Sequence, residues 1–327
     1  LWDELEKILC AKAREGVEVK IIFDDFGNIK RFSGETIDRL REVGVEVFIF
    51  NPVHEYVNRL HFNYRDHRKI ACIDGDVAYT GGVNIADEYA NLIERFGYWK
   101  DSGVCLEGEG AWGLTASFIR MCVNLGGVMH NEHDYYRPHT PVKSEGFCQP
   151  FTDGPQNNPD NPAEDVFLQM ISGARRFLYI TTPYFIPDES LMRALCIAGD
   201  GGVDVRLMLP GKPDHWYADC VAESYFGELI KHGVKVYRYT PGFLHGKSIM
   251  VDREAAFVGS ANMDYRSFEL DYECGVMVYS APMIESLLED MDMIVDRSHL
   301  VTAEEWAKRS VLRRVFEPLL RLFAIWM

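Results

Sequence analysis

Two stretches of the chain share one pattern: Asp66-His67-Arg68-Lys69-Ile70-Ala71-Cys72-Ile73-Asp74 and Leu244-His245-Gly246-Lys247-Ser248-Ile249-Met250-Val251-Asp252. Both read His-x-Lys-x-x-x-x-Asp. Fourteen residues after each histidine a second matched segment begins, Gly81-Gly82-Val83-Asn84 in the first copy and Gly259-Ser260-Ala261-Asn262 in the other. Agreement at this many positions is far beyond chance, so we infer that the chain contains one unit twice.

The sequence around these motifs repeats as well. A predicted helix, a glycine and a predicted strand occupy residues 5–23 and again 191–209, and the same succession over 37–50 returns over 226–239. Strands that alternate with helices are typical of the α/β class. We therefore predict two tandem α/β sandwich repeats related by a pseudo-twofold axis.

A connector separates the two repeats. Residues 138–162 hold six of the fourteen prolines among Asn, Asp and Gly, which is typical of chain that runs over a surface. The predicted domains are therefore 1–140 and 141–327. A buried strand within 177–186 precedes the first helix of the second repeat, and no counterpart precedes the helix at residue 5. We expect the first repeat to lack its opening strand, as in an N-terminally truncated chain.

Composition excludes several classes of protein. The 327 residues are 47% apolar and carry a formal net charge of −16, from 34 basic and 50 acidic residues. This globular composition excludes disordered and collagen-like chains, and no apolar run is long enough to predict a transmembrane helix. The acidic excess argues against general binding of nucleic acids. Eight dispersed cysteines without a Cys-x-x-Cys pair predict buried thiols in a reducing compartment.

The two motifs are expected to bring reactive side chains together. Residues two apart in a strand face the same side, so each histidine lies beside its lysine. Each aspartate begins a hairpin turn that returns the following glycine and asparagine to the same place, and we expect the aspartates to act in the turns more than in the chemistry. The predicted catalytic set is His67, Lys69, Asp74, His245, Lys247 and Asp252. The predicted phosphate-binding set is Gly82, Asn84, Ser260 and Asn262.

A duplicated site of this kind suits transfer at phosphorus. One histidine attacks the phosphorus while the other protonates the leaving alkoxide, and the roles reverse when a second alcohol enters. Two lysines supply the positive charge that stabilises the non-bridging oxygens. We therefore expect neither a metal ion nor any other cofactor.

The paired motifs resemble the HKD motifs of the phospholipase D superfamily, and their flanks are similar to bacterial cardiolipin synthases. The similar flanks are Tyr79–Tyr89, Phe96–Asp101, Thr182–Asp188 and Ala261–Leu270. The resemblance implies a phosphatidyltransferase that joins two phosphatidylglycerols into cardiolipin and releases glycerol through a phosphohistidine. It also implies a site at the cytoplasmic face of the bacterial cell membrane, with an anchor that this sequence does not contain.

The same resemblance implies roles for individual residues. By analogy His67 is the nucleophile and His245 the general acid, although the two motifs are nearly equivalent. Family members hold the imidazole of each histidine with a carboxylate farther along the chain. Here this assigns Asp101, 34 residues after His67, and Glu273, 28 residues after His245. Such an acceptor fixes the ring tautomer and stabilises the imidazolium.

Other functions share this chemistry. One alternative is phospholipase D-type hydrolysis, in which water replaces the second alcohol. Another is a nuclease, which acts on a DNA phosphodiester. A third is an inactive truncated fragment, because the expected opening strand is missing. The expected partners are phosphatidylglycerol and other anionic phospholipids at a membrane surface, with no nucleic acid. The sequence does not fix the oligomeric state.

Several further segments leave two interpretations open. A basic amphipathic helix from Trp306 to Met327 either binds an anionic membrane or packs on the domain. His130 and His133 have His-x-x-His spacing, but a solvated surface explains them better than a metal ion does. The other open roles are phosphate binding or ion pairing for Arg59, Arg65 and Arg68, and entrance lining or packing for Tyr184. Asp264 and Arg266 are expected to form a structural pair with each other, with a role in the site as the alternative.

Overall fold

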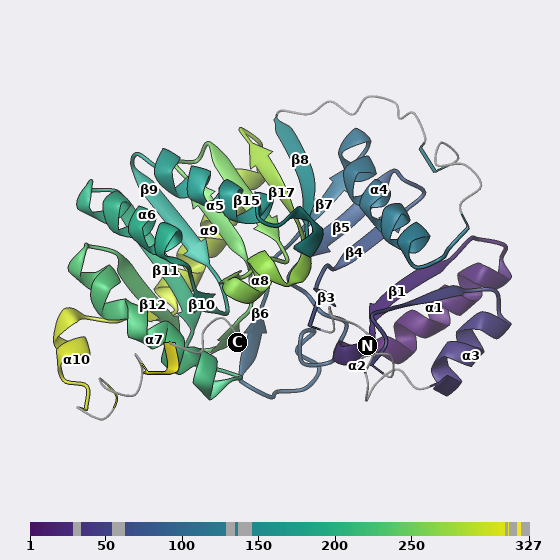
Figure 1. Cartoon of the computed structure of the whole chain (residues 1–327), viewed down its shortest axis with the longest axis horizontal. Helices are drawn as coiled ribbons and strands as arrows, with labels where there is room; N and C mark the ends of the chain where they lie inside the picture. The colour runs from purple at the N-terminus through teal and green to yellow at the C-terminus, as the bar shows by residue number, and fades with distance from the viewer. Residues whose placement is uncertain are drawn as a thin grey trace.

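Two α/β units lie side by side in the computed structural model, as Figure 1 shows from the N-terminal unit in purple and blue to the C-terminal unit in green and yellow. The structure describes residues 1–28, 34–53, 63–128, 135–136, 146–310, 313 and 319–321. The predicted α/β class is confirmed. The repeated motifs lie where the two units meet.

The second repeat is built on one large mixed sheet. Its strands run in the order β18-β12-β11-β9-β14-β15-β17, and β17 also pairs with β3 and β8. The strands are β8 (Phe147–Asp153), β9 (Phe177–Thr181), β11 (Asp204–Pro210), β12 (Lys235–Tyr239), β14 (Ser248–Val251), β15 (Ala255–Gly259), β17 (Asp271–Tyr279) and β18 (Ser298–Leu300), with the short β10 (Phe185–Ile186), β13 (Gly242–Leu244) and β16 (Met263–Asp264) outside the sheet. The helices are α5 (Pro162–Gly173), α6 (Glu189–Asp200), α7 (Trp216–Lys231), α8 (Tyr265–Glu269), α9 (Met283–Asp296) and α10 (Ala303–Ala307), with a 3₁₀ turn at Pro155–Asn157.

The first repeat has the same order of elements but two separate sheets. In one, β1 (Lys20–Asp24) pairs in parallel with β2 (Glu46–Phe50); in the other, β4 (Ile70–Ile73), β5 (Val77–Gly81) and β7 (Gly103–Glu107) are antiparallel. In the second repeat the equivalent strands belong to one sheet, because β9 lies between β11 and β14 and pairs with both. Among the described residues of the first repeat, no strand pairs with both β1 and β4 in the way that β9 pairs with β11 and β14. The sequence predicts that the first repeat lacks this strand. The other elements are α1 (Trp2–Arg14), α2 (Asp25–Asn28), α3 (Gly34–Glu42), α4 (Glu109–Asn124), β3 (Arg65–Asp66) and β6 (Tyr98–Lys100).

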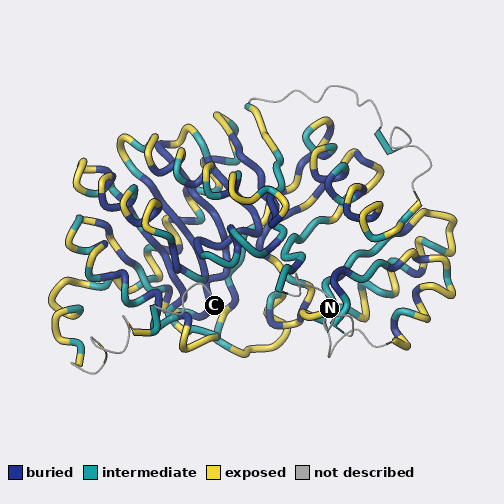
Figure 2. Tube along the Cα trace, viewed as in Figure 1, coloured by how far each residue is buried: buried dark blue, intermediate teal, exposed yellow. Residues whose placement is uncertain are grey.

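Alternating side chains of the large sheet form two hydrophobic layers. Leu178 and Ile180 of β9 cluster with residues of α5, α6 and α7, whereas Tyr179 between them clusters with residues of α9. The second layer also contains Ala78 and Val104 of the first repeat, so the two repeats share it. Figure 2 shows that buried chain is concentrated in the large sheet and at its junction with the first repeat. The functional site is therefore held on a rigid core.

Both motif aspartates begin tight turns, as predicted. Asp74 and Gly75 have φ of 54° and 69°, and Asp252 and Arg253 have 53° and 59°, which is the paired positive φ of a type I′ hairpin. Asp74 is exposed, whereas Asp252 is buried. The Asp252 carboxylate accepts three backbone N–H groups at 2.8 Å, from Arg175, Arg176 and Phe177. Asp252 thus ties its hairpin to the start of β9.

The described part of the C-terminal segment packs on α7. The Trp306 ring lies 5.4 Å from that of Phe226, and the Arg321 guanidinium lies 4.0 Å from the centre of the Tyr225 ring. Arg313 Nη1 lies 3.2 Å from Oε2 of Glu223, which is also on α7. These contacts favour packing over membrane binding for the described residues. The rest of the predicted helix, at 311–312, 314–318 and 322–327, lies outside them.

We expect Asp252→Asn to lower the free energy of unfolding by about 1–3 kcal/mol, because a neutral amide replaces the charged acceptor of three N–H groups. Urea unfolding at pH 7 measures the change. Burial raises the pKa of Asp252, but the N–H groups outweigh burial and hold the pKa below its usual value. The contribution is therefore present above the unfolded pKa of about 3.9 and is lost as pH falls through the folded pKa.

Asp74→Asn is the matched control for that prediction. It occupies the same turn position, Asn tolerates positive φ, and the Asp74 side chain is exposed. We expect it to change the free energy of unfolding by less than about 0.5 kcal/mol. Equal losses in the two variants would contradict the role assigned to Asp252.

Candidate active site

His67 is fixed by a carboxylate of the second repeat. It follows β3, which pairs with β17, and its backbone N–H donates to the Tyr272 carbonyl at 3.0 Å. The next residue of β17, Glu273, is 1% exposed, and its Oε1 lies 2.8 Å from His67 Nδ1. The hydroxyls of Ser260 and Ser267 also donate to Glu273. Because an ionised carboxylate only accepts, Nδ1 carries the proton and Nε2 keeps its lone pair.

His245 is fixed in the same way by a carboxylate of the first repeat. It follows β13, which pairs in parallel with β6, and its backbone N–H donates to the Lys100 carbonyl at 2.6 Å. The residue after Lys100 is Asp101, and its Oδ2 lies 2.7 Å from His245 Nδ1. The ring of His245 is therefore also held with Nε2 free of the carboxylate.

This pairing corrects the sequence-based assignment, which gave Asp101 to His67 and Glu273 to His245. In the structure each carboxylate crosses to the histidine of the other repeat. The physical reason is strand pairing between repeats: β3 pairs with β17, and β6 pairs with β13. Each pair sets one histidine beside a carboxylate that is distant in sequence. Each of the two motif histidines therefore forms its couple with a carboxylate of the other repeat.

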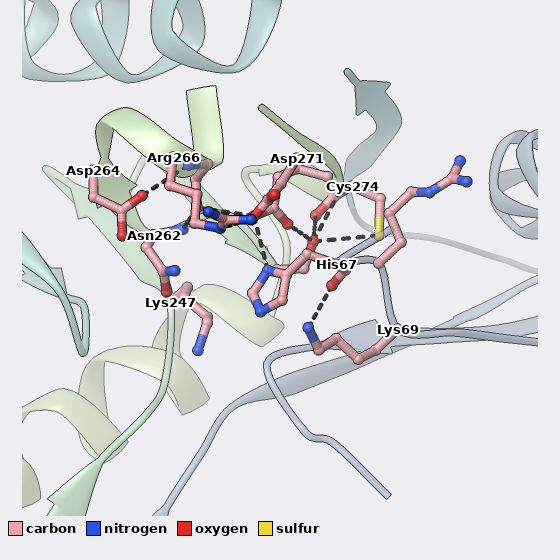
Figure 3. Close-up of polar contacts among 12 residues, drawn as sticks. His67, Lys69, Lys247, Asn262, Asp264, Arg266, Asp271 and Cys274 are labelled. Carbon is pink, nitrogen blue, oxygen red and sulfur yellow. Dashed lines mark hydrogen bonds and ion pairs between the residues drawn. The ribbon is translucent and has the colours of Figure 1, made fainter. Parts of the chain in front are cut away.

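The two motif lysines occupy equivalent positions. Lys69 Nζ donates to the His67 carbonyl, and Lys247 Nζ donates to the His245 carbonyl at 2.7 Å. Lys247 Nζ also lies 2.9 Å from His245 Nε2. Figure 3 shows the ends of both lysines near the His67 ring. Lys247 Nζ thus lies against the His245 ring, 3.0 Å from Nδ1 and 2.9 Å from Nε2, and both lysines are close enough to His67 to lower its pKa.

Burial dominates the protonation of this cluster. It lowers the pKa of His67, and together with the Lys247 charge it lowers the pKa of His245 to about 3. Burial also lowers the pKa of Lys69, and that of Lys247 to about 7. Burial raises the pKa of Asp101 and Glu273, but the neighbouring histidines and lysines outweigh it and leave both pKa values below the usual range. At neutral pH the carboxylates are ionised and the imidazoles neutral.

Two of the predicted phosphate-binding residues contact carboxylates instead. The Ser260 side chain is fully buried with its hydroxyl on Glu273, and a Cβ on Gly82 would lie 2.2 Å from Asp101 Oδ1. The backbone N–H groups expected for a phosphate are also occupied. That of Gly82 donates to the Ser102 carbonyl at 3.0 Å, and that of Ser260 to the Cys274 carbonyl at 2.8 Å. The small residues therefore accommodate the carboxylates that hold the histidines.

The two motif asparagines differ in their contacts. The Asn84 amide donates to the Tyr89 hydroxyl at 2.7 Å. Asn262 lies with Lys247 in Figure 3, and its Oδ1 is buried without a hydrogen-bond partner in the part of the chain that the structure describes. Asn262 is thus placed to contact a ligand, whereas Asn84 orients a tyrosine.

An aromatic wall around His245 escaped the sequence analysis. The ring centres of Tyr89, Trp99 and Phe243 lie 5.0, 5.5 and 5.8 Å from that of His245. The wall excludes water from one side of the imidazole. Tyr89 and Trp99 lie inside the flanks that carry the family resemblance, but no local pattern assigns them to this histidine.

Two of the three arginines with open roles, Arg65 and Arg68, make ion pairs. Arg65 Nη1 lies 3.2 Å from Asp24 Oδ1, and Arg68 contacts both oxygens of Asp66. Arg59, His130 and His133 lie outside the described residues. Asp264 and Arg266 do have structural contacts, but with other partners: Asp264 accepts the Ser267 N–H at 2.8 Å, and Arg266 Nε lies 3.4 Å from Asp271 Oδ2 (Figure 3).

One group of side chains has the composition of a metal site. The ligand atoms of His67, Asp271 and Glu273 lie within 4.8 Å of one another. However, Glu273 already accepts from His67 and two serine hydroxyls, so its oxygens are committed to holding the histidine. The arrangement is that of a hydrogen-bonded couple.

The fold and the two histidine–carboxylate couples define a site of the phospholipase D type, in which two imidazoles and two ammonium groups converge. Comparison with known proteins agrees. Residues 3–94 and 167–295 match the family described as cardiolipin synthase, PLD-like domain, and the chain belongs to this family. The resemblance predicted from the motifs is confirmed.

Known relatives extend the similarity over nearly the whole chain. A cardiolipin synthase of Halalkalibacterium halodurans is 38% identical over 99% of this chain and 64% of its own length. The major cardiolipin synthase of Bacillus subtilis is 38% identical over 99% of this chain and 67% of its own. The chain thus spans about two thirds of the length of these relatives. Among the described residues, the structure has no helix with the length and apolar character needed to cross a bilayer.

A solved structure shows the same fold. Phosphatidylserine synthase of Haemophilus influenzae aligns with a TM-score of 0.64 over 98% of this chain and 90% of its own, at 15% identity. The tandem-repeat architecture is therefore not particular to the sequences of the closer relatives.

We expect His245→Gln to flatten the loss of stability in acid. The pKa of His245 is about 3 in the folded chain and about 6.5 when unfolded, so between these values the unfolded chain binds the extra proton. The free energy of unfolding of the wild-type protein should then fall as pH falls below 6.5, by up to about 1.4 kcal/mol per pH unit from this group. Urea unfolding between pH 7 and 5 measures the slope.

His299→Gln provides the control, because His299 is an exposed histidine of β18, which lies at the opposite end of the large sheet from β17. It should keep the wild-type slope. If His245→Gln also keeps it, the neutral, desolvated state assigned to His245 is wrong.

Proposed function

We propose that this chain is the catalytic unit of a cardiolipin synthase, which transfers a phosphatidyl group from one phosphatidylglycerol to another and releases glycerol. One observation carries the proposal: two imidazoles are each held through Nδ1 by a buried carboxylate of the other repeat, and both motif lysines lie close enough to each imidazole to lower its pKa. Membership of the cardiolipin synthase family supports the lipid substrate.

In the first step His67 Nε2 attacks the phosphorus of the donor lipid. A bond forms between nitrogen and phosphorus, and the bond from phosphorus to the glycerol oxygen breaks with its electron pair on oxygen. The His245 imidazolium gives its Nε2 proton to that oxygen, and glycerol leaves. Lys69, Lys247 and Asn262 stabilise the non-bridging oxygens.

In the second step the terminal hydroxyl of another phosphatidylglycerol attacks the phosphohistidine. His245, now neutral, accepts the hydroxyl proton, the nitrogen–phosphorus bond breaks, and cardiolipin leaves with His67 restored. Glu273 stabilises the positive charge that His67 carries while it is bound to phosphorus. Asp101 does the same for the His245 imidazolium.

The assignment of nucleophile and acid follows the surroundings of the two rings. The His67 side chain is 27% exposed and that of His245 only 5%, so a bulky lipid phosphate reaches His67 more easily. His245 must be protonated in the first step, although burial and the Lys247 charge disfavour this in the free protein. A bound phosphodiester anion offsets the Lys247 charge, and it therefore raises the pKa of His245 when the substrate is present.

Exposed apolar side chains near His245 support a lipid substrate over DNA. The loop between β5 and β6 carries Tyr89, which packs on His245, and it also exposes apolar side chains. These are Val83, Ile85, Leu92 and Ile93, and Tyr98 at the start of β6 is exposed as well. Removing an acyl chain from the bilayer costs about 0.8 kcal/mol per CH₂, so the site must open against the lipid surface. We place it at the cytoplasmic face of the cell membrane, and the net charge of −16 further disfavours a nuclease.

The test is the fate of radiolabelled phosphatidylglycerol in vesicles. We expect cardiolipin and free glycerol from the wild-type protein, and no turnover from His67→Ala or His245→Ala. Phosphatidic acid as the main product would make the chain a hydrolase. A lipid adduct trapped on His245 would reverse the two histidines and leave the rest of the mechanism in place.

Glu273→Gln and Asp101→Asn should each lower kcat by about 10²–10⁴-fold, because the amide no longer stabilises the imidazolium or fixes its tautomer. Glu289→Gln, an exposed change on α9, is the control and should keep wild-type turnover. Near-normal kcat in both site variants would contradict the role of the couples.

A further inference from the structure

Tyr184 and Asp214 form a polar pair that the mechanism above does not use. Tyr184 follows β9, Asp214 follows β11, and the Tyr184 hydroxyl donates to Asp214 Oδ2 at 2.6 Å. The carboxyl ends of parallel strands meet at one edge of a sheet, so these two side chains come together there. The pair is built by the fold and not by neighbouring sequence.

The second oxygen of the carboxylate has no partner. The Asp214 side chain is 17% exposed, and its Oδ1 is buried without a hydrogen bond to any residue that the structure describes. A buried carboxylate oxygen in this state carries an uncompensated desolvation cost. A ligand that donates a hydrogen bond removes that cost.

Tyr184 is held beside the active site: its carbonyl accepts the Thr182 hydroxyl at 2.7 Å, and that hydroxyl accepts the N–H of Met263, the residue after Asn262, at 3.1 Å. Burial raises the pKa of Tyr89, and the negative charges of Asp101 and Asp214 add to the effect, so Asp214 is near the tyrosine that packs on His245. Burial and Asp214 raise the pKa of Tyr184, with a further contribution from Tyr89. One cluster therefore joins the pair to the histidine that we assign as proton donor to the leaving alcohol.

We infer that Asp214, oriented by Tyr184, is the subsite for the free hydroxyl of the glycerol headgroup. A phosphate oxygen has no proton to donate and is repelled by a carboxylate, whereas an alcohol hydroxyl donates to Oδ1. The lysines thus mark the phosphate side of the site and Asp214 the alcohol side. The inference rests on the proposed function, because that reaction has a glycerol group next to His245 in both steps.

The subsite acts on the hydroxyl next to the reacting oxygen. In the first step it holds the glycerol that leaves, and in the second it holds the glycerol headgroup of the acceptor, whose neighbouring hydroxyl attacks phosphorus. Water has no second hydroxyl to bind there while it attacks. Asp214 therefore favours transfer over hydrolysis.

Asp214→Asn and Tyr184→Phe test the subsite in vesicles of labelled phosphatidylglycerol. We expect the ratio of cardiolipin to phosphatidic acid to fall about tenfold or more in Asp214→Asn, and less in Tyr184→Phe. In the reverse reaction, from cardiolipin and added glycerol, the KM for glycerol should rise by a similar factor in Asp214→Asn. Asp296→Asn, an exposed change at the end of α9, should leave both quantities unchanged.

Each contrary outcome has its own meaning. An unchanged product ratio and glycerol KM in Asp214→Asn, with cardiolipin still formed, would overturn the subsite and leave the proposed function standing. A loss confined to phosphatidylethanolamine as donor would assign Asp214 to an ammonium group and also overturn the inference. No lipid product from the wild-type protein would overturn the proposed function, and the subsite with it.

Discussion

The crossed hydrogen bonds from His67 to Glu273 and from His245 to Asp101 are the contacts on which the rest of the site depends. Each carboxylate is buried, and a buried charge is tolerated only when its partners compensate for lost water. The pairing of β3 with β17 and of β6 with β13 supplies those partners across the two repeats. Duplication alone would give two half-sites, and strand pairing between the two repeats combines them into one site.

The chain is acidic overall, but two lysines place positive charge at the two histidines. Lys247 Nζ lies 2.9 Å from His245 Nε2, and Lys69 Nζ donates to the His67 carbonyl. Desolvation lowers the pKa of both lysines, so that a bound anion can raise it again. The two lysines set the charge that a bound phosphodiester meets, whatever the net charge of the chain. On the other side of His245, Asp214 reverses the sign of that field and suits an alcohol. The site thereby distinguishes the phosphate from the alcohol on either side of the bond that breaks.

Much of this was predictable from the sequence, and the limits have a physical cause. Equal spacing from each histidine to its Gly-Gly-x-Asn or Gly-Ser-x-Asn segment predicted the hairpins, because spacing within a hairpin is local. The partner of each histidine depends on pairing between repeats, so Asp101 and Glu273 were found but assigned to the wrong rings. The sequence predicted Ser260 to bind phosphate. It could not indicate the contact of the Ser260 hydroxyl with Glu273, because folding brings these two residues together.

The crossed arrangement is tested most directly by the Nδ1–H proton resonances of the two histidines in ¹⁵N-histidine-labelled protein. The account predicts that Glu273→Gln moves the Nδ1–H resonance of His67 and leaves that of His245 in place, and that Asp101→Asn does the reverse. Assignment of the two resonances through His67→Gln and His245→Gln fixes their identity. Movement of the His245 resonance in Glu273→Gln, with His67 unchanged, would contradict the account.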